Sequence, residues 1–192
     1  MGKAESVERI SKGSLKGRAW KFGDNISTDH IQPSQYFNLR NKLGELAKHV
    51  LEGARQDFPT LFEPGDFVVG GRNFGLGSSR ESAPAVIKEA GLGAVLAKSF
   101  ARIFFRNAIN IGLPLIICDT DRIEEGNELE VQIGKGIVCN KSVNIEIPFQ
   151  ALPSIMVQIL NDGGLLQHIR KNDGFKIESK VIDQATKPYF DD

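Results

Sequence analysis

The chain has 192 residues, of which 24 are Lys or Arg and 24 are Asp or Glu, so its formal net charge at pH 7 is zero. This balance removes the usual electrostatic motive for binding nucleic acid or an anionic membrane, and we expect neither partner. Hydrophobic residues make up 41% of the chain, near the globular average, and no apolar run approaches the ~20 residues of a membrane span. The length indicates one domain, at most with a small appendage.

The cysteines and histidines give no sign of a metal site. Cys118 and Cys139 are too few for a disulfide framework or a four-cysteine site, and the three histidines are scattered. We expect His49 and His168 on the surface. The first 15 residues are polar and lack the apolar core of a secretory signal, which favours a flexible segment in a cytoplasmic protein.

The first elements are a short strand over residues 17–22 and a loop over 25–33. An amphipathic helix follows, because apolar residues recur at helical spacing from Leu43 to Leu51, and Gly53 is expected to end it. Between residues 66 and 118, strands and helices alternate. The expected strands are 67–69, 94–97 and 113–117. Ser99 is expected to cap the helix before the last of them. Strands that are apolar on both faces and joined by helices predict an α/β fold with a parallel sheet.

After residue 119 the pattern changes. Short strands over residues 129–133, 137–139 and 143–147 are separated by turn residues and predict a small antiparallel patch. Two helices are expected over 153–160 and 165–170. The expected organisation is therefore a flexible segment 1–15, one domain over 16–170 and a polar tail over 171–192.

The most informative stretch is GGRNFGLGSSRE, residues 70–81, which leaves a buried strand and enters a helix. Glycines let a ligand approach the backbone closely, and a helix N-terminus favours anions. The stretch lacks the third glycine of G-x-G-x-x-G and the Gly-Lys-Ser/Thr of a phosphate-binding loop. It offers instead the hydroxyls of Ser78 and Ser79 and the planar fork of Arg80, which suits a carboxylate.

Each of these features has a purely structural alternative. Ser78 and Glu81 fit a helix capping box, whereas Pro84 would place the cap near Ser82. The upstream loop STDH, residues 27–30, could form a polar site or an ordinary side-chain-stabilised turn. Arg40 could be a solvated charge or a carboxylate ligand. Four glycines together with Asn73 and Arg80 in twelve residues favour a ligand site.

At this point GGRNFGLGSSRESA, GAVLAKSFARIFFRNAINIGLPLI and the upstream STDHI loop resemble the small subunits of 3-isopropylmalate dehydratase. These are the detached counterparts of the swivelling C-terminal domain of aconitase. The resemblance covers about residues 16–170 and is specific because the motifs occur together and in order. It implies a swivelling β/β/α domain with a parallel sheet flanked by helices. It also implies a hydro-lyase that acts on a hydroxy di- or tricarboxylic acid, expected to be 3-isopropylmalate in leucine biosynthesis.

The resemblance further implies that the chain is active only with a large subunit, which holds a [4Fe–4S] cluster, and that this chain itself binds no cofactor. By this resemblance, Ser78 corresponds to the family's catalytic base, and Ser79 and Arg80 correspond to its substrate-carboxylate contacts. Arg40 corresponds to a recognition residue, and Thr28 and Asp29 correspond to residues that support the active site. The recognition loop QYFNLRNK is longer than the Tyr-Leu-Arg form of some relatives. Homoaconitate, citraconate/methylmalate and 2,3-dimethylmalate therefore remain alternative substrates, and a non-catalytic anion-binding module remains an alternative function.

The residues fit this chemistry on physical grounds. Removing water across a carbon–carbon bond needs a base for the carbon-bound proton and an electrophile for the departing hydroxyl, a role open to iron. Neither Cys118 nor Cys139 has cluster spacing, so the iron must come from another chain. A serine becomes a plausible base beside an arginine, at a helix N-terminus and in a cleft without water. The loop would provide the first two conditions, and a closing partner the third.

Overall fold

The computed structural model describes residues 14–78 and 80–172. Its centre is a seven-stranded sheet with the order β4-β3-β2-β1-β5-β6-β7. The strands are β1 Leu15–Lys21, β2 Phe67–Val69, β3 Ala94–Ala97, β4 Leu115–Ile117, β5 Glu128–Gln132, β6 Ile137–Asn140 and β7 Ile145–Pro148. The α-helices are α2 Thr28–Ile31, α3 Leu43–Leu46, α4 Ser82–Glu89, α5 Arg102–Ile111, α6 Ser154–Asn161 and α7 Leu165–Lys171. The 3-10 helices are η1 Ser34–Leu39, η2 Ala47–His49, η3 Phe58–Thr60, η4 Thr120–Arg122 and η5 Ile133–Lys135.

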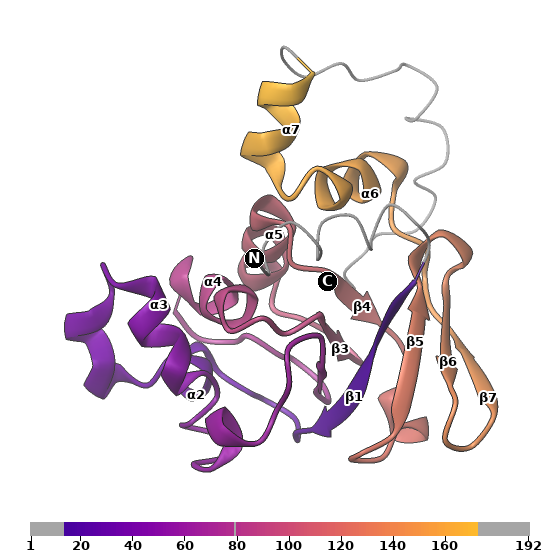
Figure 1. Cartoon of the computed structure of the whole chain (residues 1–192), viewed down its shortest axis with the longest axis horizontal. Coiled ribbons are helices and arrows are strands. Elements are labelled where there is room, and N and C mark those ends of the chain that lie inside the picture. Colours follow the sequence, from indigo (N-terminus) through magenta and orange to yellow (C-terminus); the bar gives the residue numbers. More distant parts are fainter. Residues whose placement is uncertain (1–13, 79, 173–192) are drawn as a thin grey trace.

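Strands β1 to β4 form the parallel half of the sheet. Trp20 pairs with Val68, which pairs in turn with Val95, so the strands run side by side in the same direction. Every residue of β2 and β3 is buried, which requires cover on both faces. Helices α2, α3 and α4 gather at the left of Figure 1, and α5 lies above β3 and β4. The predicted α/β class is confirmed.

Strands β5 to β7 form the antiparallel half, at the right of Figure 1. Burial alternates along β5, where Leu129 and Val131 are buried between more exposed neighbours, because this half is covered mainly on one face. The sequence pattern did not indicate how the two halves join. Strand β1 joins them, since it pairs parallel with β2 on one edge and antiparallel with β5 on the other, where Leu15 lies opposite Val131.

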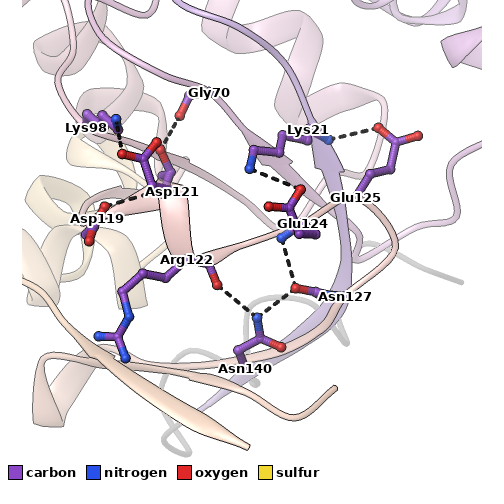
Figure 2. Close-up of polar contacts among 11 residues, drawn as sticks. Lys21, Gly70, Lys98, Asp119, Asp121, Arg122, Glu124, Glu125, Asn127 and Asn140 are labelled. Carbon is purple, nitrogen blue, oxygen red and sulfur yellow. Dashed lines mark hydrogen bonds and ion pairs between the residues drawn. The ribbon is translucent and has the colours of Figure 1, made fainter. Parts of the chain in front are cut away.

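A polar network holds the crossover between the two halves (Figure 2). The Thr120 hydroxyl donates a buried 2.9 Å hydrogen bond to the carbonyl of Gly70, at the end of β2. On the other side, the Asn140 side-chain amide in β6 donates to the carbonyl of Arg122 at 3.2 Å and to Asn127 Oδ1 at 2.7 Å. The segment between β4 and β5 is thus bonded to strands in both halves, which fixes their relative position.

The C-terminal helices pack against α5. A Cβ atom on Gly112 would lie 2.5 Å from the backbone of Gly163, so only glycine permits this approach. The expected surface position of His168 is wrong. This residue is 4% exposed, and its Nδ1 lies 2.7 Å from Asp162 Oδ2, which gives the buried ring a charged partner. No helix in the ranges 14–78 and 80–172 is long and apolar enough to cross a membrane.

The expected continuous helix from residue 43 to Gly53 is also wrong. Helix α3 ends at Leu46, η2 continues only to His49, and Leu51 adopts φ 57°. Leu51 is nevertheless fully buried, so the turns after His49 bury the apolar residue that a helix was expected to bury. Gly53 serves a close approach instead, because a Cβ atom there would lie 2.9 Å from the carbonyl oxygen of Asp29.

The expected flexible segment and polar tail lie almost wholly outside the described residues, which begin at residue 14 and end at 172.

Candidate functional site

The candidate site lies where the parallel strands end. Lys21, Val69 and Leu96 are paired across β1, β2 and β3, so the loops that follow these strands emerge at one edge of the sheet. They are the upstream loop 22–33, the glycine-rich loop 70–81 and the short segment 98–101. The carboxyl edge of a parallel sheet is the usual place for a ligand in this class of fold.

Backbone hydrogen bonds join the upstream loop to the glycine-rich loop. The amide of Thr28 donates to the carbonyl of Leu76 at 2.8 Å, and the amide of Gly75 donates to the carbonyl of Ile26 at 2.7 Å. These bonds form a short parallel bridge between residues that are about fifty positions apart in the chain. The two motifs that were singled out separately in the sequence are therefore one structural unit.

An aromatic cluster supports the glycine-rich loop from below. Phe74 is fully buried, and its ring contacts Phe100 and Phe104 with centroids 6.0 and 5.6 Å away. Gly75 has φ +81°, and a Cβ atom there would lie 2.2 Å from Phe104 Cγ. Only glycine fits this conformation and this space, so Gly75 sets the path of the loop that carries Ser78 and Arg80.

Arg80 is anchored to the upstream loop. Its Nη1 donates to Asp29 Oδ1 at 2.7 Å and to the carbonyl of Gln32 at 3.3 Å, and its Nη2 lies 3.4 Å from Ser34 Oγ. Ser34 Oγ in turn donates to Asp29 Oδ1 at 2.6 Å. Hydrogen bonds from Ser34 and then Arg80 hold the pKa of Asp29 below its usual value, so this carboxylate is charged at neutral pH.

Thr28 lies beneath the glycine-rich loop. This residue is 1% exposed, and its Oγ1 has no hydrogen-bond partner among the described residues. A Cβ atom on Gly77 would lie 3.4 Å from that oxygen, so the hydroxyl faces the backbone just before Ser78. A buried hydroxyl without a hydrogen-bond partner costs stability. The Thr28 hydroxyl is therefore a group that the contacts of the described residues leave unsatisfied.

Ser78 is exposed and lies outside helix α4, which begins at Ser82. The Ser78–Glu81 capping box is wrong, because the N-cap position is Glu81, close to where Pro84 placed it, and Glu81 makes no side-chain cap hydrogen bond. Ser82 is not the cap either: its hydroxyl donates to Gln32 Oε1 at 2.5 Å. Ser78 therefore lies before the helix start and not at it, since three residues separate it from Ser82. Ser79 lies outside the described residues.

Two further expectations concern Ser99 and Arg40. Ser99 does not cap α5, whose N-cap position is Ala101; its hydroxyl accepts from the amide of Asn73 at 2.8 Å and so fixes the glycine-rich loop. Arg40 is exposed at the end of η1, with its guanidinium 4.6 Å from the ring centroid of Phe37. No hydrogen bond or ion pair of the described residues joins Arg40 to Arg80 or Asp29.

The described residues do not fit an iron–sulfur cluster. No group of three or more potential metal ligands occurs within the part of the chain that the structure describes. Cys118 and Cys139 are both buried, and burial raises the pKa of Cys118 to about 12, which keeps it a neutral thiol. An open cavity of about 770 Å³ lies between β1, β5 and the turn at Glu63, and none of the candidate residues lines it.

Sequence reasoning missed three polar residues of the site, namely Gln32, Ser34 and Ser82. They bond Arg80, Asp29 and one another, but they lie in an apparently ordinary loop and at a helix start. Their only signal was their place in the sequence: Gln32 and Ser34 follow the STDH motif, and Ser82 follows the glycine-rich loop. The candidate residues brought together are Thr28, Asp29 and Arg80, with Ser78 close by along the chain.

The fold and the joined loops define a class of protein. Residues 22–119 match the family model "Aconitase C-terminal domain", and the chain belongs to this family.

Relatives with known names show which members of this family the chain resembles. The 3-isopropylmalate dehydratase small subunit 2 of Archaeoglobus fulgidus is 58% identical over 163 residues, which cover 85% of this chain and 99% of that protein. The isopropylmalate/citramalate isomerase small subunit of Methanocaldococcus jannaschii is 50% identical over 159 residues, covering 82% and 94%. A crystal structure of 3-isopropylmalate dehydratase from the latter organism superimposes with a TM-score of 0.80 at 43% identity, covering 83% of this chain and 95% of that one. The chain therefore stands among the small subunits of this family.

Proposed function

We propose that this chain is the small subunit of a two-subunit hydro-lyase that interconverts 2-isopropylmalate and 3-isopropylmalate by dehydration and rehydration, a reaction of leucine biosynthesis. The observation that carries the proposal is the Asp29–Arg80 ion pair of 2.7 Å, which anchors the guanidinium two positions along the chain from the exposed Ser78, at the carboxyl edge of the parallel sheet. The names of the relatives support the same reaction.

In this proposal Ser78 removes the proton from the carbon next to a substrate carboxylate. Loss of that proton and departure of hydroxide from the neighbouring carbon leave a double bond, and water then adds back in the opposite sense. A serine hydroxyl is a weak base at its ordinary pKa, so its negative form must be stabilised by a neighbouring cation. We propose that Arg80, two residues after Ser78, is this cation.

Arg80 and Ser79 are proposed to hold a substrate carboxylate. A guanidinium is always charged and presents several donors in one plane, which suits a carboxylate. Asp29 orients Arg80, and its own side chain is 56% exposed while that of Arg80 is 25% exposed. An ion pair with one partner this exposed contributes little to stability, and its proposed role is to set the direction of the guanidinium. Thr28 supports the loop from below.

The site on this chain is open and needs a partner. Ser78 and Asp29 are exposed, and the described residues offer no metal site. We propose that a large subunit closes over this edge, excludes water and carries the [4Fe–4S] cluster, while this chain binds none. Departure of the substrate hydroxyl is assigned to that subunit, and this chain supplies the base and the carboxylate contacts.

Other substrates remain candidates because η1, which precedes Arg40, is the loop that would face the variable group of the acid. Relatives include proteins named isopropylmalate/citramalate isomerase and methanogen homoaconitase small subunits. Homoaconitate, citraconate/methylmalate and 2,3-dimethylmalate are therefore the alternatives. A non-catalytic anion-binding module is the alternative from another class.

The test is an anaerobic co-purification of the tagged chain with its large subunit, followed by assays with 2-isopropylmalate, citramalate, homoaconitate and dimethylmalate. We expect the complex to be most active on isopropylmalate, and the chain alone to be inactive. Activity of the isolated chain would contradict the subunit assignment. A complex that forms but acts on none of the four acids would favour the non-catalytic module.

A further inference from the structure

A cluster of three side chains outside the candidate site contacts the loop that precedes Arg40. The Tyr36 hydroxyl donates to Glu52 Oε1 at 2.7 Å, and His49 Nδ1 lies 2.6 Å from Glu52 Oε2. The rings of Tyr36 and His49 are stacked, with centroids 3.7 Å apart and planes inclined by 17°. We call these three residues the Tyr36 clamp. Tyr36 lies in the recognition loop QYFNLRNK, His49 and Glu52 lie outside the matching motifs, and none of the three has a proposed role.

Each carboxylate oxygen of Glu52 therefore has its own partner. Partial burial opposes ionisation of Glu52, but the hydrogen bonds from Tyr36 and His49 outweigh it and hold its pKa below the usual value. The bond to Glu52 also raises the pKa of Tyr36, so its hydroxyl stays protonated and continues to donate. Hydrogen bonds to a charged group are stronger than neutral ones, so the clamp is a firm attachment.

Loop η1 depends on this attachment. None of its residues is fully buried, Phe37 is 55% exposed, and Tyr36 and Leu39 are only partly buried against the core. A segment with so few buried apolar contacts opens easily unless polar contacts hold it. At its start, Ser34 bonds Asp29, and two residues later Tyr36 bonds Glu52. The clamp is thus the second of two polar attachments before the chain reaches Arg40.

The clamp also links η1 to the helix that carries Asp29. The amide of Leu51 donates to the carbonyl of Ile31 at 2.9 Å, and Gly53 packs so closely that a Cβ atom would lie 2.9 Å from the carbonyl oxygen of Asp29. Residues 49–53 therefore hold α2 through the backbone and η1 through the side chains of His49 and Glu52. One short segment determines how the two elements are spaced.

From this arrangement we propose that Tyr36, His49 and Glu52 are positioning residues for substrate selection: they hold η1 and Arg40 at a set distance from the Asp29–Arg80 pair. This inference rests on the proposed function, in which η1 faces the variable group of the acid. The clamp touches neither Ser78 nor Arg80 among the described contacts. Loosening it should change how well the side group of the acid is held and leave proton removal intact.

The test uses the two-subunit complex with Tyr36→Phe and Glu52→Gln. Tyr36→Phe keeps the ring and its stacking but loses the bond to Glu52, and Glu52→Gln removes the charge. Loss of contacts made equally in the ground and transition states raises KM and leaves kcat unchanged. We expect KM for isopropylmalate to rise about 3- to 30-fold with kcat changed by less than about 3-fold, and the preference over citramalate to fall by a similar factor.

The matched control is Glu45→Gln, which makes the same charge change nearby. Glu45 is exposed and bonds Lys48 at 2.9 Å, and none of its described contacts is with η1. A second measurement is hydrogen exchange of residues 34–40 in the full chain without its partner. We expect faster exchange in Glu52→Gln and wild-type exchange in Glu45→Gln.

The outcomes separate the two proposals. Unchanged exchange in Glu52→Gln would overturn the clamp whatever the activity. Faster exchange with an unchanged substrate preference would overturn the role in selection and leave the proposed function intact. If the wild-type complex acts on none of the acids, the proposed function and the role in selection fail together, and the exchange experiment still decides whether the clamp holds η1.

Discussion

The two halves of the sheet differ in what lies between their strands. In the parallel half, residues 22–66 separate β1 from β2 and residues 70–93 separate β2 from β3. In the antiparallel half, residues 133–136 and 141–144 are enough to connect β5, β6 and β7. Parallel neighbours need a crossover connection, whereas antiparallel neighbours can be joined by a tight turn. The topology therefore provides long loops in only one half, and the candidate site is built from those loops.

The halves also differ in how their ion pairs are arranged. Arg80 and Asp29 come from two loops that are 51 positions apart, and the pair includes Ser34 and a backbone carbonyl. In the antiparallel half, Lys141 lies just after β6 and its Nζ is 3.0 Å from Glu130 of the neighbouring β5, with side-chain exposures of 52% and 15%. The comparison indicates that substitutions in the parallel half should change catalysis, and that equivalent substitutions in the antiparallel half should not.

The largest expected effect is that of Ser78→Ala in the assembled enzyme. Loss of a general base lowers turnover by about 10²- to 10⁴-fold. Because Ser78 is exposed, assembly and the thermal midpoint should be unchanged. The control is Ser142→Ala, which removes an exposed hydroxyl that accepts from the amide of Glu128 in the antiparallel half. Equal turnover in the two variants, measured with isopropylmalate, would remove Ser78 as the base.

The second effect is on stability. Gly75→Ala would place a methyl group 2.2 Å from Phe104 Cγ at φ +81°, and overpacking together with left-handed strain should cost about 2–4 kcal/mol. Gly134→Ala, in the antiparallel half, meets nothing within 4 Å and needs no positive φ, so it should stay within about 1 kcal/mol of wild type. Urea unfolding of the full chain measures both changes. A Gly75→Ala chain as stable as wild type would show that the aromatic cluster does not set the loop.

The parallel half of the sheet and the glycine-rich loop could be predicted from the sequence. The runs at β2 and β3 are apolar on both faces and short, and the glycines between them mark a loop with unusual backbone requirements. These signals are local, so the α/β class and the candidate loop followed directly. The motif match then gave candidate roles to Ser78 and Arg80, which remain to be tested.

What could not be predicted depends on contacts between distant residues. The bond of Arg80 to Asp29 requires the register of β1 against β2, which no local pattern encodes. The Ser78–Glu81 capping box failed because the helix begins only at Ser82, whose hydroxyl bonds Gln32 in another loop. His168 was expected on the surface because its helix is polar, and its burial becomes possible only beside Asp162. In each case a tertiary partner outweighed the local preference.

The smallest expected effects concern two carboxylates, one in each half. The hydrogen bond from Ser34 and then that from Arg80 lower the pKa of Asp29, while that from Lys141 lowers the pKa of Glu130. A lowered folded-state pKa stabilises the fold above the unfolded pKa, and this contribution is lost as pH falls through the folded value. In each pair one side chain is more than half exposed, Asp29 at 56% and Lys141 at 52%, so the change in stability should be slight and should shrink further in high salt.

The pKa values themselves distinguish the two halves. We expect Ser34→Ala to raise the pKa of Asp29 and leave that of Glu130 unchanged, and Lys141→Met to do the reverse, as measured by NMR titration of the side-chain carboxyl carbons. An Asp29 pKa that does not respond to Ser34→Ala would mean that the Ser34–Asp29–Arg80 network does not persist in solution. Arg80 would then lack its anchor, and the orientation of its guanidinium toward a substrate would have to come from the large subunit.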